Sequence, residues 1–533
     1  MKKIVYIFLA VFLFGTTACE KDILDLENPN SPGLTALTTE EGMKRAGLGV
    51  YDKFGLEYWW ITLQNHDIMG DAYFTSVGNF GWRWVNQASS ITLSDGTVLT
   101  PPQGGSQATE LRNRNSRAVG DDNAMQYEWL SMYLVNNQAN LILSAVENPD
   151  LELTGDAEAK KKVLRAWAYW WKGFAYSRIG SMYISGIIAN TLNETNNDFV
   201  SYEAVIAEAN SNFDAAIKEL EGVTATAEYE AFLGAMIPSF TKVGKGGVLS
   251  PQEWIRNMNT YKARNILVNK KVEEMTAADW NAIVTLAENG IQANDKIFTM
   301  RSANENDLVS LTAWQPYRSL ISVWSHISER LIQEYYPDDN RMERNFAIPA
   351  RGYTQLNAQG RGFAYSTRYT LIPIEQGGDY ASVEAGSAEL NIAGSYEENQ
   401  LMLAEAKIRL GQVEEGLEII DAVRAYQSAG LPAVAGSGIS QDEAAEVLRR
   451  ERRVALLKNG VAFYDARRFG FLKPVSEGGG RTNAVVLHNA KGTLELDKNA
   501  TIDYNYLERW DVPENELDFN APSAGSAPVI SPR

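Results

Sequence analysis

Aromatic side chains in a stretch rich in Gly and Asn are the first residues in this sequence that could bind a ligand. The segment DAYFTSVGNFGWRWVNQ, residues 71–87, contains two tryptophans that no helical repeat explains. Trp82 and Trp84 alternate around Arg83, so on an extended segment both indole rings would face the same way. This spacing predicts a binding surface formed by a loop.

A second aromatic group, SLTAWQPYRSLISVW at 310–324, lies next to a proline. Flat aromatic faces beside Asn, Asp and Arg suit sugars, because the C–H face of the ring stacks while the hydroxyls bond to polar groups at its edge. The alternative is that these tryptophans pack beneath the loops as small satellite cores. The predicted ligand-binding residues are Asp71, Tyr73, Asn79, Trp82, Arg83, Trp84, Trp314, Tyr317 and Arg318.

The composition argues against metal and covalent chemistry. The three histidines, His66, His326 and His488, lie far apart in the sequence and there is one cysteine, which leaves no zinc-binding constellation. VGKGG at 243–247 lacks the pattern of a phosphate-binding loop and predicts a flexible turn. Glycosidase chemistry needs two opposed carboxylates, and no pair among the 67 acidic residues is singled out. We therefore expect a protein that is not an enzyme and has no cofactor or metal.

Acidic residues outnumber basic ones, 67 to 49, and the formal net charge is −18. Such a surface repels phosphate backbones, so nucleic acid is not an expected partner. RRERR at 449–453 is a basic run, but Glu446 lies four residues before Arg450, which interlaces the charges on a helix. We expect these arginines to form internal ion pairs. The other expected members of this network are Asp465, Arg467 and Arg468.

The N-terminal residues are typical of an exported, lipid-anchored protein. Lys2 and Lys3 precede an apolar run at 4–14. As a helix this run would span about 17 Å against a hydrocarbon core of about 30 Å, so it predicts a signal peptide and not a membrane span. Small residues then lead to Cys19, which resembles the lipobox of bacterial lipoproteins. That resemblance implies cleavage after Ala18 and acylation of Cys19, and several acyl chains give stable anchoring.

The expected organisation is a signal peptide at 1–18, an acylated flexible tether at 19–38 and a single domain at 39–533. The domain shows apolar residues at helical spacing, with a Thr cap near residue 39 and a break between two helices at Gly411. The helices form pairs that resemble tetratricopeptide hairpins. Stretches without a helical pattern separate them at 75–121, 221–252, 297–320, 345–395 and 470–533. The predicted fold is mostly α, with long irregular loops that bind the ligand and little β-structure.

Several stretches, in order, resemble the SusD/RagB family of outer-membrane nutrient-binding lipoproteins. After Cys19, LDLENPNSPG is similar to the family's Asn- and Pro-rich tether. YEENQLMLAEAKIRLGQVEEGLEIIDAVRAYQSAGL at 396–431 and LRRERRVALLKNGVAFYDARRFG at 448–470 are similar to its helical signatures. The departures from the family pattern are Lys458, Asn459 and Val461, with RWDVPENEL in place of a Trp-Pro-Ile-Pro motif.

This resemblance implies a SusD-like fold and a role in nutrient uptake. The expected function is capture of a glycan or oligosaccharide at the cell surface and delivery to a SusC-like TonB-dependent barrel. The expected location is the cell outer membrane, facing the exterior and held by lipid on Cys19. Three alternatives stay open at this point: a member of the family that binds peptides, a helical-repeat adaptor between proteins, and a surface glycoside hydrolase.

Overall fold

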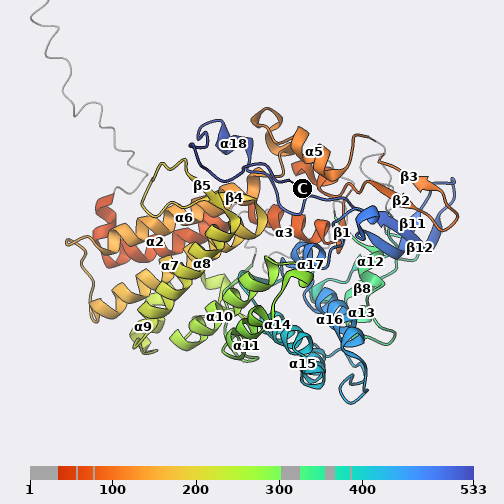
Figure 1. Ribbon diagram of the computed structural model, residues 1–533. Helices are drawn as coiled ribbons and strands as arrows, with labels where there is room; N and C mark the ends of the chain where they lie inside the picture. Colours follow the sequence, from red (N-terminus) through yellow and green to blue (C-terminus); the bar gives the residue numbers. More distant parts are fainter. Residues whose placement is uncertain are drawn as a thin grey trace, which may run out of the picture.

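Apolar stripes and capping residues place most of the chain in helices, as the sequence predicts (Figure 1). The computed structural model describes residues 34–55, 58–75, 79–101, 103–301, 325–354, 366–383 and 387–532. The predicted signal peptide, Cys19 and most of the predicted tether lie outside these ranges. The helices are α2 (Glu40–Gly55), α3 (Tyr58–Met69), α4 (Trp82–Val85), α5 (Gln107–Asn113), α6 (Gln126–Val146), α7 (Ala157–Met182), α8 (Tyr202–Leu220), α9 (Ala227–Ala235), α10 (Pro251–Val268), α11 (Ala277–Glu288), α12 (Glu329–Ile332), α13 (Asn340–Asn345), α14 (Tyr396–Arg409), α15 (Val413–Tyr426), α16 (Gln441–Ala455), α17 (Ala462–Arg468) and α18 (Glu514–Leu517).

Local signals set the ends of these helices. The Thr39 hydroxyl accepts the Gly42 N–H at 3.1 Å at the start of α2. Ser250 and Ser440 begin α10 and α16 with capping boxes, in which serine and glutamate side chains satisfy free backbone N–H groups. Gly411, at φ 84°, separates α14 from α15, which confirms the predicted break because this backbone conformation favours glycine.

The core is built around the tryptophans of α7. Trp167, Trp170 and Trp171 have no exposed surface, and the ring centroids of Trp170 and Trp171 lie 4.7 Å apart, edge to face. They pack against aromatic rings of α2 and α10, including Phe54 and Trp254. Consecutive helices also pack in pairs, α6 with α7, α7 with α8 and α14 with α15, as the hairpin prediction requires.

The β-structure consists of short strands. They are β1 (Tyr73–Phe74), β2 (Ser90–Thr92), β3 (Val98–Leu99), β4 (Ser185–Ile187), β5 (Phe199–Ser201), β6 (Thr299–Met300), β7 (His326–Ile327), β8 (Phe346–Ala347), β9 (Thr370–Leu371), β10 (Leu390–Asn391), β11 (Arg481–His488) and β12 (Glu495–Asp503). A sheet of order β11-β12-β2-β3 joins the C-terminal hairpin to an N-terminal segment, and the other sheets have two strands. The stretches expected to lack helices are more regular than predicted, since 75–121 contains α4 and α5, and 221–252 contains α9.

Buried ion pairs connect α16 and α17 to distant parts of the chain. Glu334 has a side chain 5% exposed and lies 2.7 Å from Arg449 and 2.8 Å from Arg481. Asp465 lies 3.0 Å from Arg452 and 2.8 Å from Arg468. These contacts confirm the predicted internal network.

Arg450 and Arg467 have partners other than the predicted ones. Glu446 pairs with Arg449 at 2.8 Å, and Arg450 donates to the Glu334 carbonyl oxygen. Arg467 donates to carbonyl oxygens at the C-terminal ends of α7 and α10, where a cation also complements the helix dipole.

Glu334→Gln should lower the free energy of unfolding by about 3–5 kcal/mol, because it leaves buried arginines without their carboxylate. Glu446→Gln is the matched control: this carboxylate also binds Arg449 but is 57% exposed, so its loss should cost less than about 1 kcal/mol. Urea denaturation of both variants measures the difference. Equal stabilities would contradict the role given to the buried pairs.

The same variant should also change the response to acid. Burial alone would raise the pKa of Glu334, but Arg481, Arg449 and Arg453 outweigh it and lower the pKa from 4.5 to about 2. The stabilisation is therefore complete above about pH 4.5 and is lost as the pH falls toward 2. The free energy of unfolding of Glu334→Gln should therefore fall less than that of the wild type as the pH drops from 4.5 to 2.

Candidate functional site

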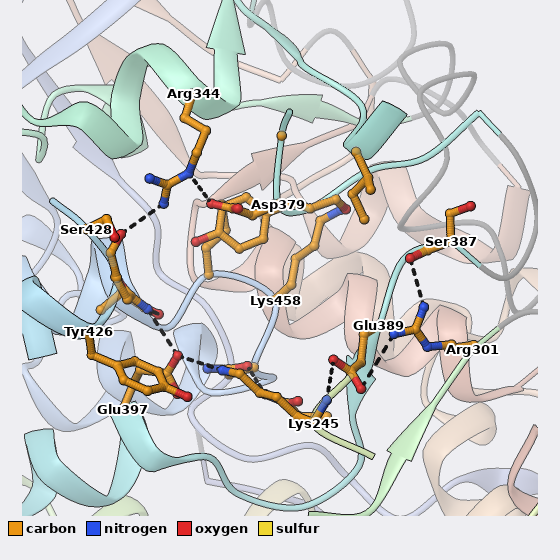
Figure 2. A pocket seen from close by; sticks show the side chains of 18 residues that line it. Lys245, Arg301, Arg344, Asp379, Ser387, Glu389, Glu397, Tyr426, Ser428 and Lys458 are labelled. Carbon is orange, nitrogen blue, oxygen red and sulfur yellow. Dashed lines mark hydrogen bonds and ion pairs between the residues drawn. The ribbon is translucent and has the colours of Figure 1, made fainter. Parts of the chain in front are cut away.

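A cavity of about 610 Å³ opens where loops and helix ends from the middle of the chain meet the ends of α15 and α16 (Figure 2). Its lining is rich in charged and polar side chains. The lining residues are Lys245, Arg301, Arg344, Ile374, Gly378, Asp379, Tyr380, Ser387, Glu389, Asn391, Glu397, Tyr426, Gln427, Ser428, Ala455, Leu457, Lys458 and Asn459.

Strand pairing places one side of this cavity. β6 and β10 are antiparallel, with Leu390 opposite Met300, so the preceding Glu389 and the following Arg301 meet. Their side chains lie 3.7 Å apart, and Arg301 also donates to the Ser387 carbonyl oxygen at 3.0 Å.

The Gly-rich turn at 243–247 forms the adjoining edge. The backbone N–H groups of Lys245 and Gly246 donate to the two carboxylate oxygens of Glu389, at 3.2 and 3.0 Å. The turn at 243–247, predicted to be flexible, thus forms part of the cavity wall and binds the Glu389 carboxylate.

Two further ion pairs lie on the cavity wall. Lys245 is 3.0 Å from Glu397 in the first turn of α14, and Arg344 of α13 is 2.8 Å from Asp379. Burial disfavours the charge on Lys245, but Glu397 and Tyr426 outweigh it and raise the pKa of Lys245. Lys245 therefore keeps its positive charge near neutral pH.

Tyr426, the last residue of α15, gives the cavity an accessible aromatic ring. The residue is 37% exposed, and its ring packs against Tyr396 with centroids 4.7 Å apart. Lys245 Nζ lies 5.1 Å from the ring centroid. The ring is thus held in place yet open to a ligand.

Lys458 lies in the lining between the Arg344–Asp379 and Arg301–Glu389 pairs (Figure 2). It follows α16 with φ 63° and is 4% exposed. Its Nζ donates to the Tyr380 carbonyl oxygen at 2.6 Å and lies 5.6 Å from the Tyr73 ring centroid. Burial lowers the pKa of Lys458 well below its usual range, and Asp67 offsets this only in part.

Two of the predicted tryptophans, Trp82 and Trp84, lie in the core of this structure. Residues 82–85 form the short helix α4 and not the extended segment expected, and the preceding Gly81 has φ 69°, with no room for a Cβ beside the Asp122 carbonyl. Trp82 has no exposed surface and Trp84 is 3% exposed. Two guanidinium groups, of Arg83 and Arg114, lie against the Trp84 ring at 3.8 and 3.6 Å.

The remaining predicted residues have different surroundings. Asp71 is buried and pairs with Arg330 at 2.7 Å, while Asn79 is exposed. Tyr73 is buried, but its ring faces Lys458 and so lies just behind the cavity wall. Trp314, Tyr317 and Arg318 lie outside the described residues. A ligand-binding role for the predicted set stays a prediction.

The described lining residues include none of the predicted ligand-binding residues, because residues that lie far apart in the chain form this cavity. Two signals were present: the Gly-rich turn around Lys245, and Lys458, which departs from the family pattern. Neither signal indicated that these residues meet.

Comparison with known proteins identifies the class of protein. The model of the SusD family matches residues 396–523, which contain α14–α18. A SusD superfamily protein from Bacteroides vulgatus ATCC 8482 has a TM-score of 0.54 at 14% identity, over 90% of this chain and 97% of that chain. NanU of B. fragilis has a TM-score of 0.52 at 15% identity, over 84% and 92%. A structure with xylogluco-oligosaccharide has a TM-score of 0.58 at 15% identity, over 92% and 99%.

The chain therefore has the SusD-like fold over nearly its whole length, and residues 396–523 match the model of the SusD family. This confirms the family resemblance and the predicted fold class. A search among curated proteins gave no significant match. Within the described ranges, no helix is long and apolar enough to cross a membrane, and no three His, Cys, Asp or Glu side chains gather as metal ligands would.

Trp82→Ala should lower the free energy of unfolding by about 3–5 kcal/mol, because it leaves a cavity in a packed core. Phe519→Ala is a suitable control, since Phe519 is 76% exposed and its loss should change stability little. Chemical denaturation measures both. If Trp82→Ala folds with wild-type stability but loses ligand binding, the tryptophan belongs to the site and not to the core.

Proposed function

We propose that this protein is a cell-surface lipoprotein that captures a glycan or oligosaccharide and delivers it to a SusC-like TonB-dependent barrel in the outer membrane. The observation that carries the proposal is the cavity beside Tyr426, in a chain of SusD-like fold. It combines an accessible aromatic ring with the amide side chains of Asn391, Gln427 and Asn459. A sugar ring stacks on the aromatic ring, and its hydroxyls hydrogen-bond to the amide side chains.

The proposed anchor is lipid on Cys19 after removal of residues 1–18. Residues 19–38 then tether the domain formed by 39–533 outside the membrane. The apolar run that ends before Cys19 supports this arrangement, since several acyl chains on one residue give stable attachment.

The cavity favours binding over hydrolysis. A glycosidase needs one carboxylic acid that donates a proton and a second carboxylate opposite it. The three cavity carboxylates, Asp379, Glu389 and Glu397, all form ion pairs, and Glu389 also accepts two backbone N–H groups. Each cavity carboxylate is thus engaged by groups of the protein itself.

Tyr426→Ala should weaken glycan binding about 10-fold, because it removes the stacking face of the cavity. Isothermal titration calorimetry with a panel that includes xylogluco-oligosaccharides measures this. Tyr169→Ala is the matched control: Tyr169 is partly buried on α7 and does not line the cavity.

The other outcomes discriminate between the alternatives. Unchanged binding in Tyr426→Ala would place the glycan elsewhere. Turnover of the panel would indicate a hydrolase, binding of peptides alone would indicate a peptide-binding protein, and binding of neither would favour the adaptor.

A further inference from the structure

The cavity lining contains two asparagine side chains that hydrogen-bond to each other. Asn391 Nδ2 donates to Asn459 Oδ1 at 3.1 Å, and both residues line the same cavity as Tyr426. Within the described part of the chain, no hydrogen bond engages the other end of either amide. The pair therefore leaves one acceptor, Asn391 Oδ1, and one donor, Asn459 Nδ2. If both amides turned over, one donor and one acceptor would again be left.

Gln427, the third amide of the lining, has different surroundings. Its oxygen accepts a hydrogen bond from Arg341 at 2.9 Å, and its Nε2 donates to the Ala455 carbonyl oxygen at 3.0 Å. Both ends of this amide already have partners in the protein. Asn391 and Asn459 therefore offer a ligand the more available groups.

The backbone holds both asparagines in place. Asn391 lies on β10, which pairs with β6; because successive side chains of a strand face opposite sides, the burial of Leu390 directs Asn391 away from the core. Asn459 lies between Lys458 and Gly460, whose φ angles are 63° and 66°, in the turn that follows α16. A pair fixed in this way binds a ligand at a lower entropic cost than a mobile one.

One donor beside one acceptor suits a particular ligand chemistry. A hydroxyl group both donates and accepts hydrogen bonds, so of two adjacent sugar hydroxyls one can donate to Asn391 Oδ1 while the other accepts from Asn459 Nδ2. A carboxylate only accepts and an ammonium group only donates, so each would leave one end of the pair without a partner. Such an unpaired polar group weakens binding.

We propose that Asn391 and Asn459 determine the specificity of the cavity by binding two adjacent free hydroxyls of a neutral sugar unit. Tyr426 supplies the stacking face for a sugar ring, and the asparagine pair selects units that carry both hydroxyls over units that lack one of them. The inference rests on the proposed function and narrows its ligand class.

The test removes one hydroxyl at a time from a bound sugar. Cellotetraose, mannotetraose, xylotetraose and a xylogluco-oligosaccharide are titrated by calorimetry, and the tightest binder is compared with its monodeoxy analogues. Loss of either of two hydroxyls on neighbouring carbons should weaken binding about 10-fold, because a site that hydrogen-bonds a hydroxyl rejects the analogue without it.

Asn391→Leu and Asn459→Leu assign the two hydroxyls to their partners. Leucine has nearly the shape of asparagine without its polar atoms, so in each variant one monodeoxy analogue should bind as tightly as the parent sugar, and a different one in each. Asn281→Leu is the matched control, since Asn281 is exposed on α11 and outside the cavity; it should remain sensitive to both losses. Circular dichroism with thermal unfolding checks that the variants fold, and if they do not, the monodeoxy series on the wild type alone decides.

Several results would overturn the inference. Monodeoxy analogues that all bind as tightly as the parent sugar would leave glycan binding standing and remove the asparagine pair as the selector. Sensitivity to both losses that persists in folded Asn391→Leu and Asn459→Leu would assign the hydroxyls to other residues. Tighter binding of oligoglucuronate than of any neutral sugar would contradict the neutral class. No binding of any oligosaccharide would reject the inference and the proposed function together, and binding of tetraalanine in that case would assign the pair to an extended peptide.

Discussion

Ion pairs between buried arginines and carboxylates hold distant segments of this fold together. A buried charge is costly without a partner of opposite sign, so the arginines of α16 and α17 that pair with carboxylates fix the positions of the segments that supply those partners. Glu334 and Asp465 are two such partners, and Glu451 joins Arg341 to Arg424. The end of α16 continues into Leu457, Lys458 and Asn459 on the cavity wall. The network thus holds one side of the cavity in register with the other.

The sequence predicts those features that depend on local spacing. Apolar stripes and caps identify α2, α7, α14 and α15, and interlaced charges identify the arginine network of α16. The two tryptophans near residue 83 show the limit of this reasoning: a polar, Gly-rich neighbourhood suggested an exposed loop, yet α4 buries both rings. Whether a side chain is buried depends on the distant segments that pack over it, and the local sequence does not show which segments these are.

The cavity could not be predicted for a related reason. Its residues come from positions 245–459 and meet through the register of β6 with β10 and the placement of α15 and α16. Besides the Gly-rich turn, Lys458 and Asn459 drew attention in the sequence, as departures from a family pattern. The structure places both departures just after α16, on the cavity wall. In the proposed function, capture of a sugar depends on the aromatic ring of Tyr426.

A detergent pull-down of the native protein from outer membranes, with its companions identified by mass spectrometry, would test whether the protein delivers its ligand to a barrel. We expect recovery from the membrane fraction with a TonB-dependent barrel in stoichiometric amount, since capture serves uptake only if a transporter receives the ligand. Recovery alone, or with soluble proteins only, would contradict delivery to a barrel.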